Sequence, residues 1–512
     1  MSKQLTYQIF NLIKRLTKAE KRHFKLYAKS NSSEKETAVV KLFDLLDRQN
    51  ELDEEKILKA FPGVQSNVLS NHRANLYEHL LSSLRLLHNH DPGIRIKELI
   101  SYADLLHNKG LYAQCLNQLN RAKQIAIKNQ MDILRLEIVE LEKRVETRYV
   151  TGSTPDRAQE LTKESRDLRS HFYFAGSWSD LSLELYDYYL KFGHVTNREE
   201  ADKITDLFKS NAPQSVDSMG SESIFYFQSY VWYYHIIQAF PLCYKYAKRW
   251  CEYFEKQPGL MKEEPEMYIR GYHNMLSSLF FCDKVSRFRE ELVSLERFID
   301  NHENEFNENQ LIQAFTYVET ARLNLFFLEG KFTDGAKYCL EFEKRLESNK
   351  GRIDMHRMMI FQYKMACLKF GSGDFHGSLR HLNVIVNNPT LALKEDIQSY
   401  ARFLSLIVHY ELGNDDLIYF QIKSTYRFML KLKNFQKVHA AIFKFLRQSL
   451  YIDRETLIPS FEGLRNEFLE ITKDKYERRP LLYLDMISWL ESKIYNRPVE
   501  KIIREKKLDM GA

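Results

Sequence analysis

Apolar residues recur at helical spacing along most of the chain. Near the start, Leu5, Ile9, Leu12 and Leu16 follow one another at intervals of three and four residues, which places them on one face of an α-helix. Further along, the same periodicity is interrupted by short breaks, so that each stretch predicts two helices joined by a turn. Such stretches cover residues 181–208, 224–254, 267–299 and 311–346. The pattern predicts an all-α fold.

The first 92 residues form a helical unit of their own in this prediction. Thr17 is followed three residues later by Glu20, and together they form a capping box that marks the start of a second helix. A short helix is expected over residues 53–60 and a long one over residues 66–88, separated by a Pro-Gly turn. We therefore expect residues 1–92 to be an N-terminal helical unit.

After residue 93, two segments share one spacing of small, glycine and aromatic residues. Each has a small residue, a glycine seven positions later, an aromatic residue two positions after the glycine, and apolar or small residues on the helix that follows. Looser copies surround Gly330 and Gly413. The matching positions are Ala103, Gly110, Tyr112, Cys115, Leu119 and Ala122 in residues 101–126, and Ala366, Gly373, Phe375, Ser378, Leu382 and Ile385 in residues 366–385.

This spacing resembles the tetratricopeptide repeat (TPR). The resemblance implies an α-solenoid of antiparallel helix pairs wound into a right-handed superhelix, in which each pair buries its apolar face against the next. Gly330 and Gly373 are 43 residues apart and Gly373 and Gly413 are 40 apart, whereas the family unit has 34 residues. The helices or their linkers are therefore longer than usual. We expect the solenoid to cover residues 93–452 and capping helices to cover residues 453–512.

The composition agrees with long helices, and the use of cysteine agrees with a reducing compartment. The chain has 33 Phe and 30 Tyr but only 18 Gly and 11 Pro, which is too few turn-forming residues for an all-β protein of 512 residues. Its six cysteines form no CxxC pair and lie in apolar helical stretches, so we expect small buried side chains. No signal peptide and no long uninterrupted apolar run is recognisable, which favours a cytoplasmic protein without a membrane segment.

Patterns that carry catalysis or bind metals and cofactors are not recognisable in the sequence. Phosphate-binding glycine loops, zinc-protease and nucleophile-elbow motifs are all missing. His88 and His90 are close together, but they lie at a helix end without a cysteine partner, where a basic side chain is favourable anyway. We therefore expect no enzyme, no cofactor and no metal site.

The resemblance also implies where a partner would bind. In TPR proteins the first helix of each pair lines the concave side, and a groove of this kind suits a peptide or a helix. Counting back from the turn glycines places aromatic and polar side chains in this groove. They are Asp104, His107, Asn108, Tyr317, Thr320, Asn324, Tyr363, Tyr400, Phe403 and Tyr410.

A second candidate surface lies at the basic N-terminus. Residues 1–30 contain eight Lys or Arg and one Glu, while the remaining chain is close to neutral. The outline of a helix-turn-helix comes next in the chain, with Ser66, Asn67, Ser70, Asn71 and Arg73 opening its second helix, although acidic residues outnumber basic ones over residues 31–92. The face that could attract nucleic acid or an acidic partner consists of Lys14, Arg15, Lys18, Lys21, Arg22 and Lys25.

The sequence therefore predicts a non-enzymatic scaffold or adaptor that binds a protein or peptide segment through the concave face of a helical-repeat array. The alternative is a regulator whose N-terminal unit contacts nucleic acid while its repeats sense a partner. A layout of this kind is similar to that of bacterial peptide-sensing transcription regulators.

Overall fold

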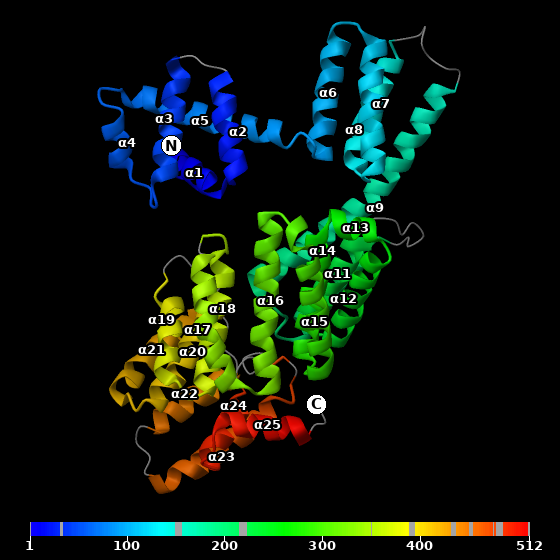
Figure 1. Cartoon of the computed structure of the whole chain (residues 1–512). Coiled ribbons are helices and arrows are strands. Elements are labelled where there is room, and N and C mark those ends of the chain that lie inside the picture. Colours follow the sequence, from blue (N-terminus) through cyan, green and yellow to red (C-terminus); the bar gives the residue numbers. More distant parts are fainter. Residues whose placement is uncertain are drawn as a thin grey trace. The chain divides into compact units, whose positions relative to one another are not determined.

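The structure is a computed structural model of the whole chain and confirms an all-α fold (Figure 1). It describes residues 2–30, 34–148, 156–213, 223–349, 351–388, 395–431, 437–449, 454–474, 476–477 and 485–509. Over these ranges the regular elements are α-helices and one short 3-10 helix, with no strand. The chain divides into two compact units, Met1–Phe172 and Tyr173–Ala512.

The first unit contains eight helices and the first part of a ninth. The capping box predicted at Thr17 is present, because the backbone N–H of Glu20 donates to Thr17 Oγ1 at 3.2 Å and the backbone N–H of Thr17 donates to Glu20 Oε2 at 2.7 Å. The helices are α1 (Ser2–Arg15), α2 (Lys18–Ser30), α3 (Glu34–Arg48), α4 (Glu54–Ala60), α5 (Ser66–Leu87), α6 (Pro92–Asn108), α7 (Tyr112–Lys128), α8 (Asp132–Glu146) and α9 (Arg157–Phe192), which continues into the second unit.

Separate hydrophobic clusters stabilise the two parts of the first unit. One cluster joins α1–α5 around Phe24, Phe43 and Leu76, which are almost fully buried. Another joins α6, α7 and α8 around Leu119 and Ile138. The sequence motif at residues 101–126 forms the α6–α7 hairpin, and the turn glycine Gly110 has a φ of +72°, a left-handed conformation that favours glycine.

The second unit holds the remaining helices. Its first element is the part of α9 after residue 172. The later elements are α10 (Arg198–Asn211), α11 (Ser223–Ile236), α12 (Phe240–Glu255), α13 (Pro258–Glu263), α14 (Pro265–Phe281), α15 (Val285–His302), η2 (Glu303–Glu305), α16 (Glu308–Glu329), α17 (Phe332–Ser348), α18 (Met355–Gly371), α19 (Phe375–Val386), α20 (Glu395–Glu411), α21 (Asp415–Lys431), α22 (Lys437–Ser449), α23 (Arg454–Ile471), α24 (Met486–Ile494) and α25 (Val499–Asp509).

Helices of the second unit pack in sequence order, and alternate helices also contact one another. α14 packs on α15, α16 on α17, α18 on α19 and α20 on α21, each pair joined by a short turn. In addition α14 contacts α16, α16 contacts α18, and α18 contacts α20. We call α14, α16, α18 and α20 the first helices and α15, α17, α19 and α21 the second helices. The first helices therefore form a continuous row (Figure 1).

Small residues allow the close packing of helices both within a pair and between neighbouring pairs. In the α18–α19 pair, the hydroxyl of Ser378 donates to the backbone oxygen of Ala366 at 2.9 Å, and both residues are fully buried. In α17, a side-chain carbon at Gly335 would lie 2.9 Å from Leu368 of α18. The helices thus approach at the positions where the sequence motif has small residues.

The last two helices lie against the turns of earlier pairs. Trp489 of α24 donates its indole N–H to Glu411, the last residue of α20, at 2.5 Å. In α25, the guanidinium of Arg504 donates to the backbone oxygen of Gly330 at 3.1 Å, and Lys507 pairs with Asp283 at 2.6 Å. The C-terminal helices share the hydrophobic cluster of the first and second helices.

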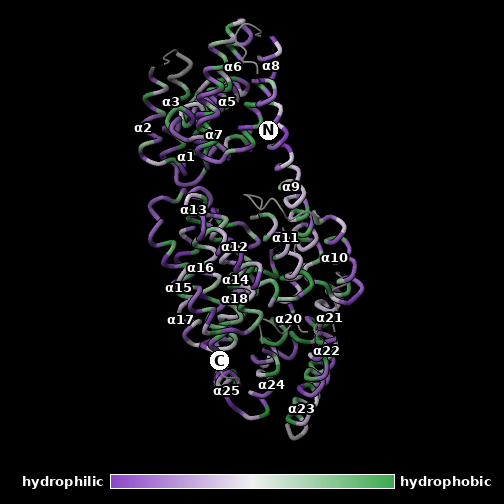
Figure 2. The backbone as a smooth tube through the Cα atoms, turned by 90° about the vertical axis from the view of Figure 1, so that its right-hand side faces the viewer, coloured by the Kyte–Doolittle hydropathy of each residue, from purple (hydrophilic) through white to green (hydrophobic). Residues whose placement is uncertain are grey.

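Hydrophobic and hydrophilic positions both recur along the helices (Figure 2). Within the described residues, none of the helices combines the length and the apolar character that crossing a membrane requires. All six cysteines are free thiols, and Cys282 is the one that is partly exposed, while the others are buried as expected.

Candidate partner-binding face

The predicted groove residues of the first unit are largely exposed on α6. Asp104 and Asn108 are exposed, and His107 is half-buried. The ring of His107 packs edge-on against Tyr112, with 5.6 Å between the ring centres. The structure therefore places these three side chains at the C-terminal half of α6, near the Gly110 turn.

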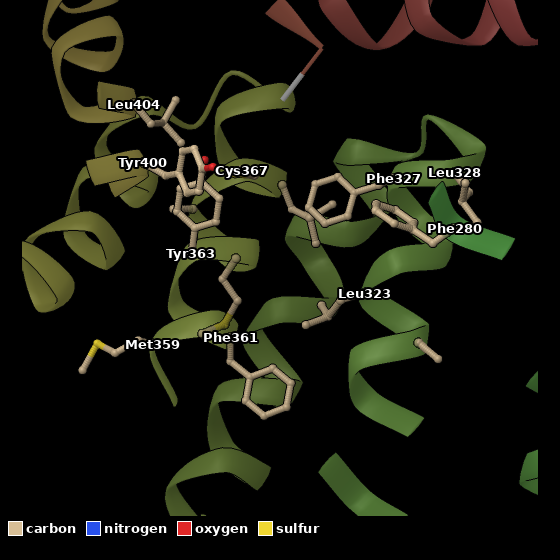
Figure 3. Close-up of a cluster of buried hydrophobic side chains, with 14 of the residues drawn as sticks. Phe280, Leu323, Phe327, Leu328, Met359, Phe361, Tyr363, Cys367, Tyr400 and Leu404 are labelled. Atoms are coloured by element: carbon tan, nitrogen blue, oxygen red, sulfur yellow. The ribbon is translucent and has the colours of Figure 1, made fainter. Parts of the chain in front are cut away.

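The predicted groove residues of the second unit are mostly buried between neighbouring first helices. Tyr317, Asn324, Tyr363 and Tyr400 are each less than a tenth exposed. Tyr363 of α18 and Tyr400 of α20 lie together, with ring centres 6.2 Å apart, and Figure 3 shows Cys367 beside them. Thr320, which is half-buried, donates its hydroxyl to the backbone oxygen of Thr316.

Two predicted groove residues of α20 pack against the C-terminal helices and α22. Phe403 is buried and meets the ring of His439 edge-on at 4.9 Å. Tyr410 is half-buried and lies about 6 Å from the rings of Phe445 and Trp489, at 5.9 Å and 6.4 Å respectively. Burial and the neighbouring Glu411 raise the pKa of Tyr410 to about 12. These contacts give Phe403 and Tyr410 a role in packing.

Three side chains from α14, α16 and α18 form a first layer of contacts across the row. The His273 ring lies flat on the Tyr317 ring, with 4.0 Å between centres and an interplanar angle of 8°. The guanidinium of Arg357 lies 4.7 Å from the centre of the same tyrosine ring and donates to the Tyr317 hydroxyl at 3.2 Å. Cation–π and stacking contacts of this kind hold the three side chains in register.

A second layer lies two helical turns further along the same three helices. The ammonium group of Lys364 donates to Asn324 Oδ1. It also lies 5.6 Å from the ring centre of Phe280 and 5.8 Å from that of Phe327, the two rings that Figure 3 labels on α14 and α16. Burial lowers the pKa of Lys364 to about 8, so the side chain is mainly protonated at neutral pH.

Sequence reasoning did not identify His273, Arg357 or Lys364. Counting back from Gly373 selects Tyr363, which is the neighbour of Lys364 in the sequence. A signal was present, since Lys364 interrupts an otherwise apolar stretch of α18, where a solvated lysine is not expected. The contact of Lys364 with Asn324 comes from the packing of α16 on α18.

The predicted basic face lies on α1 and α2 and is partly tied to α3. Lys21 pairs with Asp47 at 2.6 Å and Lys25 with Asp44 at 2.7 Å, while Lys14 donates to the backbone oxygen of Asp47. Lys18 and Arg22 are exposed. A shallow hollow on this surface is lined by Lys18, Lys21, Arg22, Lys25, Leu26 and Lys29.

The predicted helix-turn-helix segment corresponds to α4, a turn at Gly63 and α5. Ser66, Asn67 and Asn71 are exposed at the start of α5. Arg73 differs from the expectation for a base-reading side chain, because it is buried and pairs with Glu54 of α4 at 2.7 Å. Its guanidinium therefore joins two helices of the core.

Metal ligands are the remaining kind of site to consider in the part of the chain that the structure describes. There, no group of three His, Cys, Asp or Glu side chains has a geometry that could hold a metal ion. His88 of the predicted histidine pair lies 3.0 Å from Glu20 of α2. No protein-family model matches the chain, and neither does any curated protein.

Proposed function

We propose that the second unit is a TPR-like α-solenoid that works as a non-enzymatic scaffold and binds a protein or peptide segment. The partner would lie along the first helices, which would line the concave side. One observation carries the proposal: α14, α16, α18 and α20 contact one another in order while each also packs on its own second helix. Stacking of this kind presents one continuous face built from equivalent helices.

The chemistry of that face supports a polypeptide partner. Tyr317, Tyr363 and Asn324 are buried in the packing of the first helices, and the half-buried Arg357 lies over the Tyr317 ring. Side chains of these types dominate the binding energy in protein interfaces, because they combine a large apolar area with directed hydrogen bonds. Thr320 and Ile360 are half-buried between the two layers of contacts and mark the accessible part of the face.

Site-specific photocrosslinking in the native cell tests this proposal. Thr320 or Ile360 would each be replaced by a photoreactive phenylalanine, and the matched control would be Leu340, which is 55% exposed on the second helix α17. We expect adducts with the same polypeptide at both first-helix positions and none at Leu340. Equal adducts at all three positions, or adducts at Leu340 alone, would contradict binding at the first-helix face.

A second candidate function concerns the first unit, and the hollow on α2 favours it. Five of its six lining residues are cations, and a cationic surface attracts the phosphate backbone of a nucleic acid. We propose nucleic-acid contact there as the alternative function. Lys18, Arg22 and Lys29 are exposed and do not hold α3, so their replacement leaves the fold intact.

Binding of double-stranded and single-stranded DNA and RNA at increasing salt tests the alternative. The triple variant Lys18→Glu, Arg22→Glu and Lys29→Glu is expected to abolish binding that falls steeply with salt. The control changes three exposed cations elsewhere in the same unit, Lys109→Glu, Arg121→Glu and Lys128→Glu, with the same change in charge. Equal losses in both variants, or no binding by the wild type at low salt, would remove this candidate.

A further inference from the structure

The two layers of contacts lie on the same face of three neighbouring helices. His273 and Phe280 of α14, Tyr317 and Asn324 of α16, and Arg357 and Lys364 of α18 are each seven residues apart. Seven residues correspond to about two turns of an α-helix, so each pair points in one direction. Arg270 lies one turn before His273, and we call the set Arg270, His273, Tyr317, Asn324, Arg357 and Lys364 the cationic–aromatic face.

The electrostatic environment of this face is positive. Burial first, and then the positive charges of Arg357, Lys364, Arg270 and His235, lower the pKa of His273 to about 3. His273 is therefore neutral at physiological pH, and the positive charges around it oppose its protonation. The charges that produce the field at neutral pH are those of Arg270, Arg357 and Lys364.

One carboxylate, that of Asp354, compensates part of the charge of Arg357. Asp354 approaches Arg357 at 3.2 Å, but it is exposed and lies one turn away on the same helix. Within the described residues, Arg270 makes no ion pair. Glu319 of α16 is buried on another side of its helix, where Arg322 and Arg345 bind it.

The positive charge of the cationic–aromatic face contrasts with the overall charge balance of the second unit. Residues 173–512 contain nearly equal numbers of acidic and basic residues. A long polyanion would meet as many negative as positive groups along such a surface, whereas a short acidic segment meets only the local cluster. The side chain of Arg357 is 35% exposed, and a guanidinium group can bind a carboxylate with two parallel hydrogen bonds.

We propose that the cationic–aromatic face binds an acidic peptide segment. Carboxylates of Asp or Glu in the peptide would pair with Arg270 and Arg357, and the buried Lys364 would add to the positive potential. This assignment rests on the proposed function, since it names the chemical class of the partner at the first-helix face. An arriving carboxylate also offsets the cost of holding the Lys364 ammonium group away from water.

The test measures binding of a fluorescein-labelled peptide of alternating Glu and Ala to the full chain by fluorescence anisotropy at low salt. The double variant Arg270→Gln and Arg357→Gln is expected to bind at least about tenfold more weakly, because it removes the two cations that would bind the carboxylates of the peptide. The matched control, Lys245→Gln with Arg249→Gln on α12, changes the net charge equally and leaves the face intact.

A further variant, Lys364→Met, removes the buried charge and keeps the volume of the side chain, so it tests the face if the arginine variant unfolds. It is expected to weaken binding while circular dichroism stays unchanged. Equal losses in the face variants and the control would overturn the proposal, as would equal binding of a Lys-Ala peptide. Tighter binding of single-stranded DNA that the same face variants abolish would also overturn it, in favour of a nucleic acid.

Failure of this assignment can be told apart from failure of the proposed function. Crosslinks to a polypeptide at Thr320 and Ile360 do not depend on the charge of that polypeptide. If those crosslinks form while the Glu-Ala peptide does not bind, the scaffold function stands and the acidic class is wrong. If neither is seen, the first-helix face is not the binding face.

Discussion

Gly330, in the turn between α16 and α17, lies directly against Ile503 of the C-terminal helix α25. A side-chain carbon at Gly330 would lie 3.0 Å from Cγ2 of Ile503 and 3.3 Å from Cγ of Arg504. Both distances are shorter than an ordinary van der Waals contact, so a side-chain carbon would push Ile503 and Arg504 away by a few tenths of an ångström. Glycine suits this turn for two reasons. Its φ of +62° is left-handed, and its missing side chain makes room for α25.

Gly330→Ala is therefore expected to loosen α25. The matched variant is Gly413→Ala, because Gly413 has a φ of +66° and open space around it. Both changes cost about 1 kcal/mol of backbone strain, and Gly330→Ala adds about 1–3 kcal/mol from overpacking. Hydrogen exchange should show lost protection in residues 499–509 for Gly330→Ala alone. Equal loss in both variants would mean that α25 does not depend on this contact.

Glu319 joins α16 and α17 through a buried carboxylate, and its removal should destabilise the second unit. It accepts hydrogen bonds from Tyr338 at 2.6 Å, Arg345 at 2.7 Å and Arg322 at 3.0 Å. Glu319→Ala leaves Arg345 without its carboxylate, whereas Arg322 keeps Glu296 at 2.8 Å. Because both arginines are partly exposed, we expect a cost of about 1–3 kcal/mol. The exposed Glu341→Ala on α17 is the control, with an expected change below about 0.5 kcal/mol.

Tryptophan fluorescence measures this difference in a denaturant titration. All four tryptophans lie in residues 173–512, so their signal reports on the second unit. A Glu319→Ala midpoint equal to that of Glu341→Ala would show that the carboxylate contributes nothing net to stability.

Lys364 is expected to make the second unit more stable as the pH rises above 8. Its pKa is about 8 in the folded state and 10.5 ordinarily, so between these values the unfolded chain holds the proton and the folded chain does not. Stability then increases with pH by up to about 1.4 kcal/mol per unit. The neighbouring Cys367 acts in the opposite direction, because burial raises the pKa of its thiol from 9.0 to about 12. Its contribution is present with and without Lys364, so a comparison with a Lys364 variant isolates the lysine.

The measurement compares wild type with Lys364→Met at pH 8 and pH 10. The difference in unfolding free energy between the two proteins should shift in favour of the wild type as the pH rises. A constant difference would show that Lys364 releases its proton at the same pH in both states.

His439 of α22 should destabilise the second unit under acid conditions. It is fully buried, and burial lowers its pKa from 6.5 to about 4. Between these values the unfolded chain binds a proton that the folded chain does not, so stability falls as the pH drops from about 6.5 to about 4. His439→Leu should reduce this slope by up to about 1.4 kcal/mol per pH unit, whereas the exposed His376→Leu should leave it unchanged. Parallel slopes for all three proteins would contradict the assignment.

The helices and their ends could be predicted because their signals are local. Apolar periodicity, the Thr17–Glu20 capping box and the glycines at residues 110, 330, 373 and 413 all act over a few residues. The small residues of the repeat motif also predicted close helix packing, which Ser378 and Ala366 show. The partner-binding role of the predicted groove residues stays a prediction, as does the stacking of the helix pairs into a solenoid.

The residues alone thus predict the all-α fold, the hairpin turns and the positions at which helices approach, since each depends on neighbours within one or two turns of chain. The packing of whole helices, in contrast, buries Tyr363, Tyr400 and Phe403, brings Lys364 to Asn324, and places α25 on the Gly330 turn. The last contact joins residues 174 positions apart, and Lys364 and Asn324 are 40 apart. Such pairings depend on how whole helices pack together, and no local pattern encodes them.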